Sequence, residues 1–95
     1  MEFIWDELKN RSNRQKHGVS FETAVLVFDD AHQVSRPERT VDGEVRWQTI
    51  GMVNGIYILL VTHTVSASAD EEVIRIISAR KATPQERRVY AEEGF

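Results

Sequence analysis

The sequence predicts a small α+β domain in which an antiparallel sheet carries helices packed on one face. Two apolar, β-branched runs joined by Asn54-Gly55 are typical of a tight hairpin. A third run of the same kind covers residues 73–79, and helical segments flank all three. Because 95 residues, 41% of them hydrophobic, can bury one core but not two, we expect residues 1–95 to form a single domain with the order β-α-α-β-β-β-α.

The first third of the chain predicts a short strand and two helices. Residues 3–5 form an apolar run, and Asp6 after it is a preferred helix N-cap. This first helix is expected to end at Gly18 and to lie mostly on the surface, because it has little apolar surface of its own. Ser20 caps a second helix over residues 21–28, whose apolar residues recur at helical spacing, so this helix is expected to pack on the core.

The middle of the chain predicts a polar segment followed by a hairpin. Residues 31–43 are polar and contain turn signals, and an extra strand around residues 32–35 is an open alternative. Strands are expected at residues 44–53 and 56–64, with Asn54-Gly55 as the turn. The polar segment is therefore expected to form a connection, and the hairpin is expected to form the centre of the sheet.

A two-residue turn would determine the register of this hairpin. If Val53 pairs with Ile56, Arg46 lies directly opposite His63. One face of the hairpin would then be apolar near the turn and end in a guanidinium beside an imidazole. Since His63 lies in a strongly apolar strand, a buried, hydrogen-bonded histidine and a functional one are both open interpretations.

The last third predicts a loop over residues 66–72, the third strand and a final helix. Thr83 and Glu86 have the spacing of a capping box, and Pro84 occupies the first helical position, where its missing N–H costs nothing. Arg75 and Arg80 are five residues apart, so a regular strand would place them on opposite faces. Unless a bulge intervenes, only one of them shares a face with His63, and Arg80 is the preferred candidate.

Charge is distributed unevenly in a chain whose net charge is -3. Residues 9–17 contain four lysines and arginines with no acid, and residues 75–88 contain five with one acid. A polyanion could bind such a basic side and a basic protein the opposite side, although a solvated, mixed-charge surface is the alternative. The chain has no cysteine and no N-terminal apolar run long enough for a signal peptide or a membrane span, so we expect a cytoplasmic protein.

The reactive residue types favour chemistry without a metal ion or another cofactor. The histidines, at positions 17, 32 and 63, show no metal-ligand spacing, and no phosphate-binding glycine loop or serine or cysteine nucleophile motif is present. Cations with histidines and tyrosines fit metal-free cleavage of RNA, because RNA supplies its own 2′-OH nucleophile and arginine stabilises charge on phosphate. A histidine at a helix end, such as His17, is more often only a cap.

Several stretches together resemble the BrnT family of type II toxins. The similarity covers nearly the whole chain in the same order and departs from the family pattern after His63-Thr64, where residues 65–69 replace a more charged link. The stretches that carry it are Phe3-Ile4-Trp5-Asp6, Lys16-His17-Gly18-Val19-Ser20-Phe21-Glu22, Val27-Phe28-Asp29, Arg46, Ile50-Gly51, His63-Thr64, Arg75-Ile76-Ile77-Ser78-Ala79-Arg80-Lys81-Ala82, Glu86-Arg87 and Tyr90.

The resemblance implies a compact fold similar to RelE-type ribonuclease toxins, an RNA substrate and growth arrest. It also implies a BrnA-like ribbon-helix-helix antitoxin, through which alone the toxin reaches operator DNA to repress the shared operon. The positions that match the family's site predict catalytic roles for Arg46, His63, Arg80 and Tyr90, and RNA-binding roles for Arg75 and the nearby Lys16 and His17. The basic clusters add Lys9, Lys81 and Arg87 as RNA-binding candidates. A non-catalytic binding partner of the antitoxin and a degenerate toxin are the alternatives.

Overall fold

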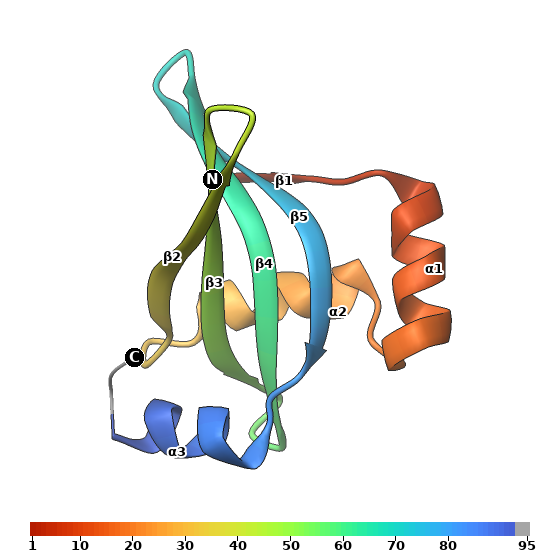
Figure 1. Ribbon diagram of the computed structural model, residues 1–95, viewed down its shortest axis with the longest axis vertical. Coiled ribbons are helices and arrows are strands. Elements are labelled where there is room, and N and C mark those ends of the chain that lie inside the picture. Colours follow the sequence, from red (N-terminus) through yellow and green to blue (C-terminus); the bar gives the residue numbers. More distant parts are fainter. Residues whose placement is uncertain (93–95) are drawn as a thin grey trace.

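The computed structural model describes residues 1–92, which form a five-stranded sheet in the order β1-β5-β4-β3-β2 (Figure 1). β1 runs parallel to β5, and every other neighbouring pair is antiparallel. The fold is therefore α+β, as predicted, but the sheet is mixed. The strands are β1 (Glu2–Ile4), β2 (Val34–Val41), β3 (Glu44–Val53), β4 (Tyr57–Ser68) and β5 (Glu71–Lys81).

Two predictions about the sheet were wrong. The sheet was expected to be antiparallel throughout, but two helices separate β1 from the next strand, and β1 docks in parallel on the edge of β5 with Glu2 opposite Val73. The expected order lacked β2, which was only an alternative over residues 32–35 and is a full edge strand. β2 contains Pro37 beside a bulge, a position at which a missing N–H is tolerated.

All three helices begin where the sequence predicts, and α1 also ends at the predicted residue, Gly18. Asp6 accepts the Leu8 N–H at 2.8 Å to cap α1 (Glu7–His17), and α3 (Pro84–Ala91) opens with the complete capping box. The second helix is shorter than expected, since α2 (Phe21–Ala24) continues as the 3-10 helix η1 (Val25–Asp29). Within the described residues, no helix is long and apolar enough to cross a membrane.

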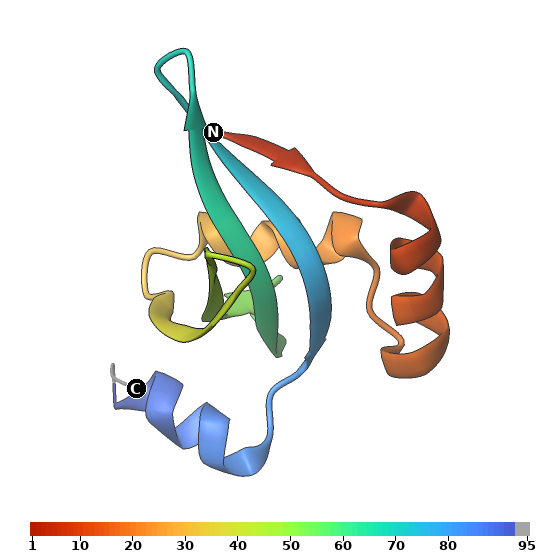
Figure 2. The same ribbon diagram turned by 45° about the horizontal axis from the view of Figure 1, so that its top comes forward.

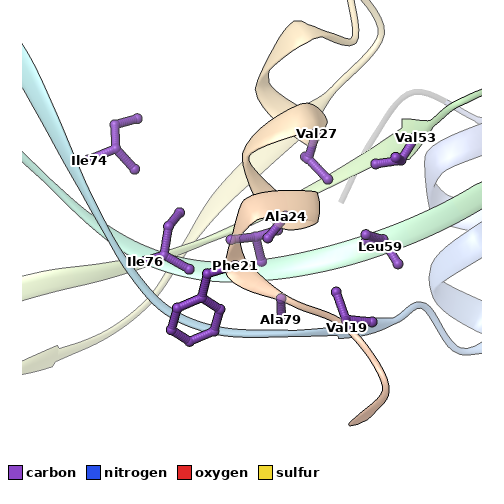
Figure 3. Close-up of a cluster of buried hydrophobic side chains, with 10 residues drawn as sticks. Val19, Phe21, Ala24, Val27, Val53, Leu59, Ile74, Ile76 and Ala79 are labelled. Atoms are coloured by element: carbon purple, nitrogen blue, oxygen red, sulfur yellow. The ribbon is translucent and has the colours of Figure 1, made fainter. Parts of the chain in front are cut away.

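The main core lies between the sheet and the α2-η1 segment (Figure 3). Phe21 is fully buried, and the backbone of β3 approaches η1 closely at Gly51. A Cβ on Gly51 would lie 2.8 Å from Cγ1 of Val27, so only glycine allows this contact. The buried residues of this core are Val19, Phe21, Ala24, Val27, Val53, Leu59, Val61, Ile74, Ile76 and Ala79.

The helices cover both faces of the sheet, whereas one covered face was expected. Ile50 and Leu60 are cross-strand partners whose parity is opposite to that of Leu59 and Val61 in the main core, yet both are buried. α3 lies across this end of the sheet, on the side away from α2 (Figures 1 and 2). The prediction was wrong because α3, which was expected on the same face as α2, packs on the apolar end of the second face.

The polar helix α1 is attached by two buried asparagines, Asn13 to the sheet and Asn10 to α2. The Asn13 side-chain amide donates to the Ala79 carbonyl at 2.7 Å and accepts the Ala79 N–H at 3.2 Å. Asn10 accepts the Phe21 N–H at 2.8 Å and donates to Glu22 at 2.8 Å. Asn13 therefore pairs the backbone N–H and carbonyl of Ala79 at the edge of β5, beyond the residues that pair with β1. Because these hydrogen bonds hold α1 in place, the helix needs little apolar surface.

Candidate nucleic-acid interface

The β3-β4 hairpin differs from its predicted register by one residue. Its loop includes Ile56 as well as Asn54 and Gly55, whose φ angles of 55° and 66° are left-handed. Val53 consequently pairs with Tyr57, and Trp47 lies opposite His63. The predicted Arg46–His63 pair was wrong, because a one-residue shift moves the side chains of a strand to the other face.

A bulge in β5 changes the faces on which its arginines lie. Thr62 and His63 of β4 are consecutive, but their partners on β5 are Ser78 and Ile76, so Ile77 is an extra residue. As a result Arg75, opposite Thr64, and Arg80, opposite Leu60, project from the same face, and His63 projects from the other. The expectation that one of these arginines shares a face with His63 was wrong.

These shifts bring basic side chains onto the sheet face opposite α2, which we call the open face. It is defined by five arginines from three strands, with Gln48 and Thr62 between them. Contacts across the strands agree with this parity, since Arg75 binds Glu44 at 2.8 Å and the Arg36 Nη2 binds Gln48 at 3.1 Å. The arginines are Arg36, Arg39, Arg46, Arg75 and Arg80.

Two of these arginines lie directly opposite each other. Arg39 of β2 pairs with Arg46 of β3. Like charges in this position destabilise a sheet, and the acidic neighbour of Arg39 is Glu38, at 3.6 Å. Such a pair favours an anionic ligand, because a phosphate between the two guanidiniums would replace repulsion by attraction.

Arg80 lies where the open face meets α3. Its Nη1 and Nη2 donate to Oε1 and Oε2 of Glu86 at 2.8 and 2.9 Å. The hydrogen bonds from Arg80 lower the pKa of Glu86, and the bonds to Glu86 raise the pKa of Arg80. Glu86 also accepts the Thr83 N–H at 2.9 Å, so one carboxylate both caps α3 and orients the guanidinium.

Tyr90 connects α3 to the end of η1. Its hydroxyl donates to Oδ2 of Asp30 at 2.6 Å, and the Met52 N–H donates to the same oxygen at 2.7 Å. The hydrogen bond to Asp30 is the main cause that raises the pKa of Tyr90 to about 12. Burial disfavours the charged form of Asp30, but these hydrogen bonds outweigh it, and the pKa of Asp30 is lowered. Tyr90 is therefore protonated at neutral pH, and its proton is donated to Asp30.

His63 lies on the covered face and is 3% exposed. Its Nε2 hydrogen-bonds the Thr49 hydroxyl at 2.7 Å, and its ring meets the edge of Phe28 with 5.0 Å between centroids. Burial lowers the pKa of His63. The catalytic role of His63 stays a prediction, and this position, away from the open face, does not favour it.

The predicted RNA-binding residues divide into separate groups. Lys9, Lys16 and His17 of α1 line a depression of about 220 Å³ at the edge of β5, next to Ser78. Arg75 lies on the same strand but outside this depression, on the open face, where it binds Glu44.

Lys81 and Arg87 lie apart from this group. Lys81 has the opposite parity to Arg80, and its ammonium lies 5.3 Å from the centroid of Tyr57. Arg87 is exposed on α3, where its Nη1 donates to the Ala82 carbonyl at 3.4 Å. The structure therefore gathers the α1 cations in one depression and places Arg75, Lys81 and Arg87 outside it.

Sequence reasoning missed Arg36 and Arg39 because β2 was expected to be mainly a polar connection. The signal that was available is the combination of charged residues with Pro37 directly ahead of a hairpin, which is typical of an edge strand. Glu86 was recognised only as a cap, and its ion pair with Arg80 depends on where α3 docks. Among the described residues, no group of three or more histidine, aspartate or glutamate side chains could hold a metal ion.

A family model and a solved structure that resemble this chain both belong to one kind of toxin. A family model described as the ribonuclease toxin BrnT of type II toxin-antitoxin systems matches residues 5–86. The 1.1 Å crystal structure of the Brucella abortus ribonuclease toxin BrnT is similar with a TM-score of 0.61 and 27% identity. The alignment covers 87% of this chain and 97% of that one. No curated protein sequence matches the chain.

Proposed function

The chain belongs to the BrnT family of ribonuclease toxins of type II toxin-antitoxin systems, and we propose that it cleaves RNA on its open face without a metal ion. The observation that carries this proposal is the concentration of five arginines on that face, including the opposed pair Arg39 and Arg46. A surface of this kind binds the phosphate backbone of a single strand. Similarity to RelE-type toxins remains a prediction from the resemblance.

The proposed chemistry needs little beyond positioning and charge stabilisation. The 2′-OH of RNA loses its proton to water and attacks the adjacent phosphorus, the P–O5′ bond breaks, and the departing O5′ takes up a proton. The products carry a 2′,3′-cyclic phosphate and a 5′-OH. Arg46 and Arg75 would hold the phosphate, and Arg80, oriented by Glu86, would stabilise charge on the phosphorane. Tyr90 would give up its hydrogen bond to Asp30, pass its proton to the leaving oxygen and then regain a proton from water.

We propose that RNA cleavage by this toxin arrests growth and that an antitoxin controls the toxin. A type II toxin has an antitoxin partner. We infer that this partner is a BrnA-like ribbon-helix-helix protein, that it neutralises the toxin in the cytoplasm, and that operator DNA is bound only through it.

Purified protein and RNA in excess EDTA provide the direct test. We expect cleavage fragments with 2′,3′-cyclic phosphate ends and no cleavage of the 2′-O-methyl RNA of the same sequence. Arg75→Ala should slow cleavage at least about tenfold if its guanidinium holds the phosphate. Arg11→Ala, which removes an exposed arginine of α1 outside the proposed site, is the matched control and should cleave normally. Cleavage that depends on added divalent metal would contradict the proposal.

A binding module without catalytic activity is the second candidate. The ion pair between Arg80 and Glu86 favours it to some extent, because a paired guanidinium is less available to RNA than a free one. Induced expression of the chain alone distinguishes the two candidates. Growth arrest that Arg75→Ala abolishes supports the ribonuclease, and normal growth with folded protein in the cells supports the binding module.

A further inference from the structure

The covered face contains a pocket that the proposed RNA site does not use. It has a volume of about 240 Å³ and lies where the sheet extends beyond the α2-η1 core. Its walls are mostly apolar, and two of their residues, Met1 and Val65, are 62% and 39% exposed. We call it the His63 pocket, and the lining residues that matter here are Phe28, Trp47, Thr49, His63, Val65 and Glu72.

His63 lines this pocket, and one of its buried ring nitrogens has no hydrogen-bond partner among the described residues. Its Nε2 is bonded to the Thr49 hydroxyl, which lies 2.6 Å from the Ser35 hydroxyl, but its buried Nδ1 has no hydrogen-bond partner among the described residues. A buried nitrogen without a partner costs free energy. A ligand with one polar group beside an apolar body would remove this cost.

The mouth of the pocket is acidic. Glu72 lines it, and a neighbouring hollow of about 520 Å³ shares Val65 and Glu72 and continues past Asp70 and Glu71 at the β4-β5 turn. The N-terminal ammonium lies 3.4 Å from Glu71, whereas no described residue forms an ion pair with Glu72 or Asp70. The two hollows adjoin at Val65 and Glu72, and we call them together the groove, which has an apolar end and an acidic end.

We propose that this groove binds a segment of the antitoxin, with an apolar side chain in the His63 pocket and a lysine or arginine beside Glu72 and Asp70. A backbone or side-chain group of the segment would hydrogen-bond Nδ1 of His63. The negative charge excludes RNA from this groove, and its two adjoining hollows suit several consecutive residues of a peptide rather than one small molecule. The inference rests on the proposed function for the identity of the partner.

The test measures the affinity of the purified toxin for its antitoxin, the product of the adjacent reading frame that relieves growth arrest. Glu72→Lys should weaken binding about tenfold or more and reduce its salt dependence, because it reverses the charge at the mouth of the groove. Val65→Asp should weaken binding to a similar extent by placing a carboxylate in the apolar end. Glu92→Lys makes the same charge reversal at an exposed position on the C-terminal side of α3 and should leave the affinity unchanged.

Tryptophan fluorescence shows whether binding occurs in this groove. In a Trp5→Phe background, Trp47 is the remaining tryptophan, and its emission should shift when the antitoxin binds. Unchanged affinity in folded Glu72→Lys protein, or unchanged Trp47 emission on saturation with antitoxin, would overturn the inference. RNA cleavage by the free variants is measured separately. If wild-type protein fails to cleave RNA while Glu72→Lys still weakens antitoxin binding, the proposed ribonuclease activity is wrong and the proposed antitoxin-binding groove is supported.

Discussion

Replacing Glu86 with glutamine changes the charge beside Arg80 without removing the helix cap. Both carboxylate oxygens of Glu86 accept from Arg80, and Oε1 also accepts the Thr83 N–H. Glutamine at this position still completes a capping box, but it offers one acceptor oxygen and no negative charge. Glu86→Gln therefore leaves the guanidinium at the end of the open face without its counter-charge.

The expected magnitudes follow from the exposure of the pair. The Arg80 side chain is 36% exposed and that of Glu86 is 17% exposed, so the pair is intermediate between a surface ion pair and a buried one. Its loss should cost about 1 kcal/mol, which corresponds to a decrease in Tm of roughly 4–8 °C for a domain of this size. RNA binding should strengthen, and its salt dependence should steepen by about 0.7 in the slope of log K against log salt.

The pH dependence of stability provides a check on the contribution of the Arg80–Glu86 pair. The folded-state pKa of Glu86 is lowered, so its contribution to stability is complete above the unfolded value of 4.5 and is lost as the pH falls through the folded value. The stability difference between wild type and Glu86→Gln should therefore be largest near neutral pH and decrease as the pH falls below 4.5. Thermal melts at a series of pH values measure it.

RNA binding is best measured by fluorescence anisotropy with 2′-O-methyl RNA, which the protein cannot cleave by the proposed route. Arg80→Ala should change the salt slope in the opposite direction to Glu86→Gln, and Glu92→Gln should leave it unchanged. Equal slopes for wild type and Glu86→Gln would refute the argument that Arg80 faces RNA with its charge partly neutralised. Cleavage of ordinary RNA should decrease in Glu86→Gln, because the guanidinium loses the partner that orients it.

Three further changes test other parts of the structure. Arg46→Ala should leave the Tm unchanged or slightly higher, because it removes the repulsion with Arg39, while the affinity for RNA falls in an anisotropy titration. Asn13→Ala should cost about 3 kcal/mol in chemical denaturation, since it leaves both backbone groups of Ala79 unsatisfied. The folded-state pKa of His63 is lowered by burial, so wild-type stability should fall as the pH drops below 6.5, and the Tm of His63→Gln should depend less on pH between 7.5 and 5.

The local signals of the sequence were sufficient to predict where each helix begins. The Asp6, Ser20 and Thr83 caps all form the expected hydrogen bonds, because capping depends on residues within one turn of each other. The docking of α1 could not be predicted in the same way. Asn13 and Ala79 are 66 residues apart, so their contact depends on the tertiary fold. The sequence predicted a surface helix, and the structure shows that buried amides attach it.

The edge strands and their pairing were harder to predict than the central strands. β2 has six exposed residues among its eight, so it lacks the apolar alternation that identifies a strand and is stabilised by pairing with β3. The parallel pairing of β1 with β5 depends on which edge of the sheet stays free once the hairpins have formed, and a three-residue strand carries no signal for that choice.

Two one-residue shifts determine the composition of the candidate site. The extra loop residue Ile56 removes Arg46 from the face of His63, and the extra strand residue Ile77 allows Arg75 and Arg80 to share a face. Residue types alone predicted a site that combined arginines with the imidazole. The backbone instead separates them, with cations on the open face for an anionic ligand and His63 in a groove with an acidic mouth on the other. Because each shift reverses the parity of a strand, a protein that lacked either one would divide its arginines between the faces and lose the charge density on which the proposed RNA site depends.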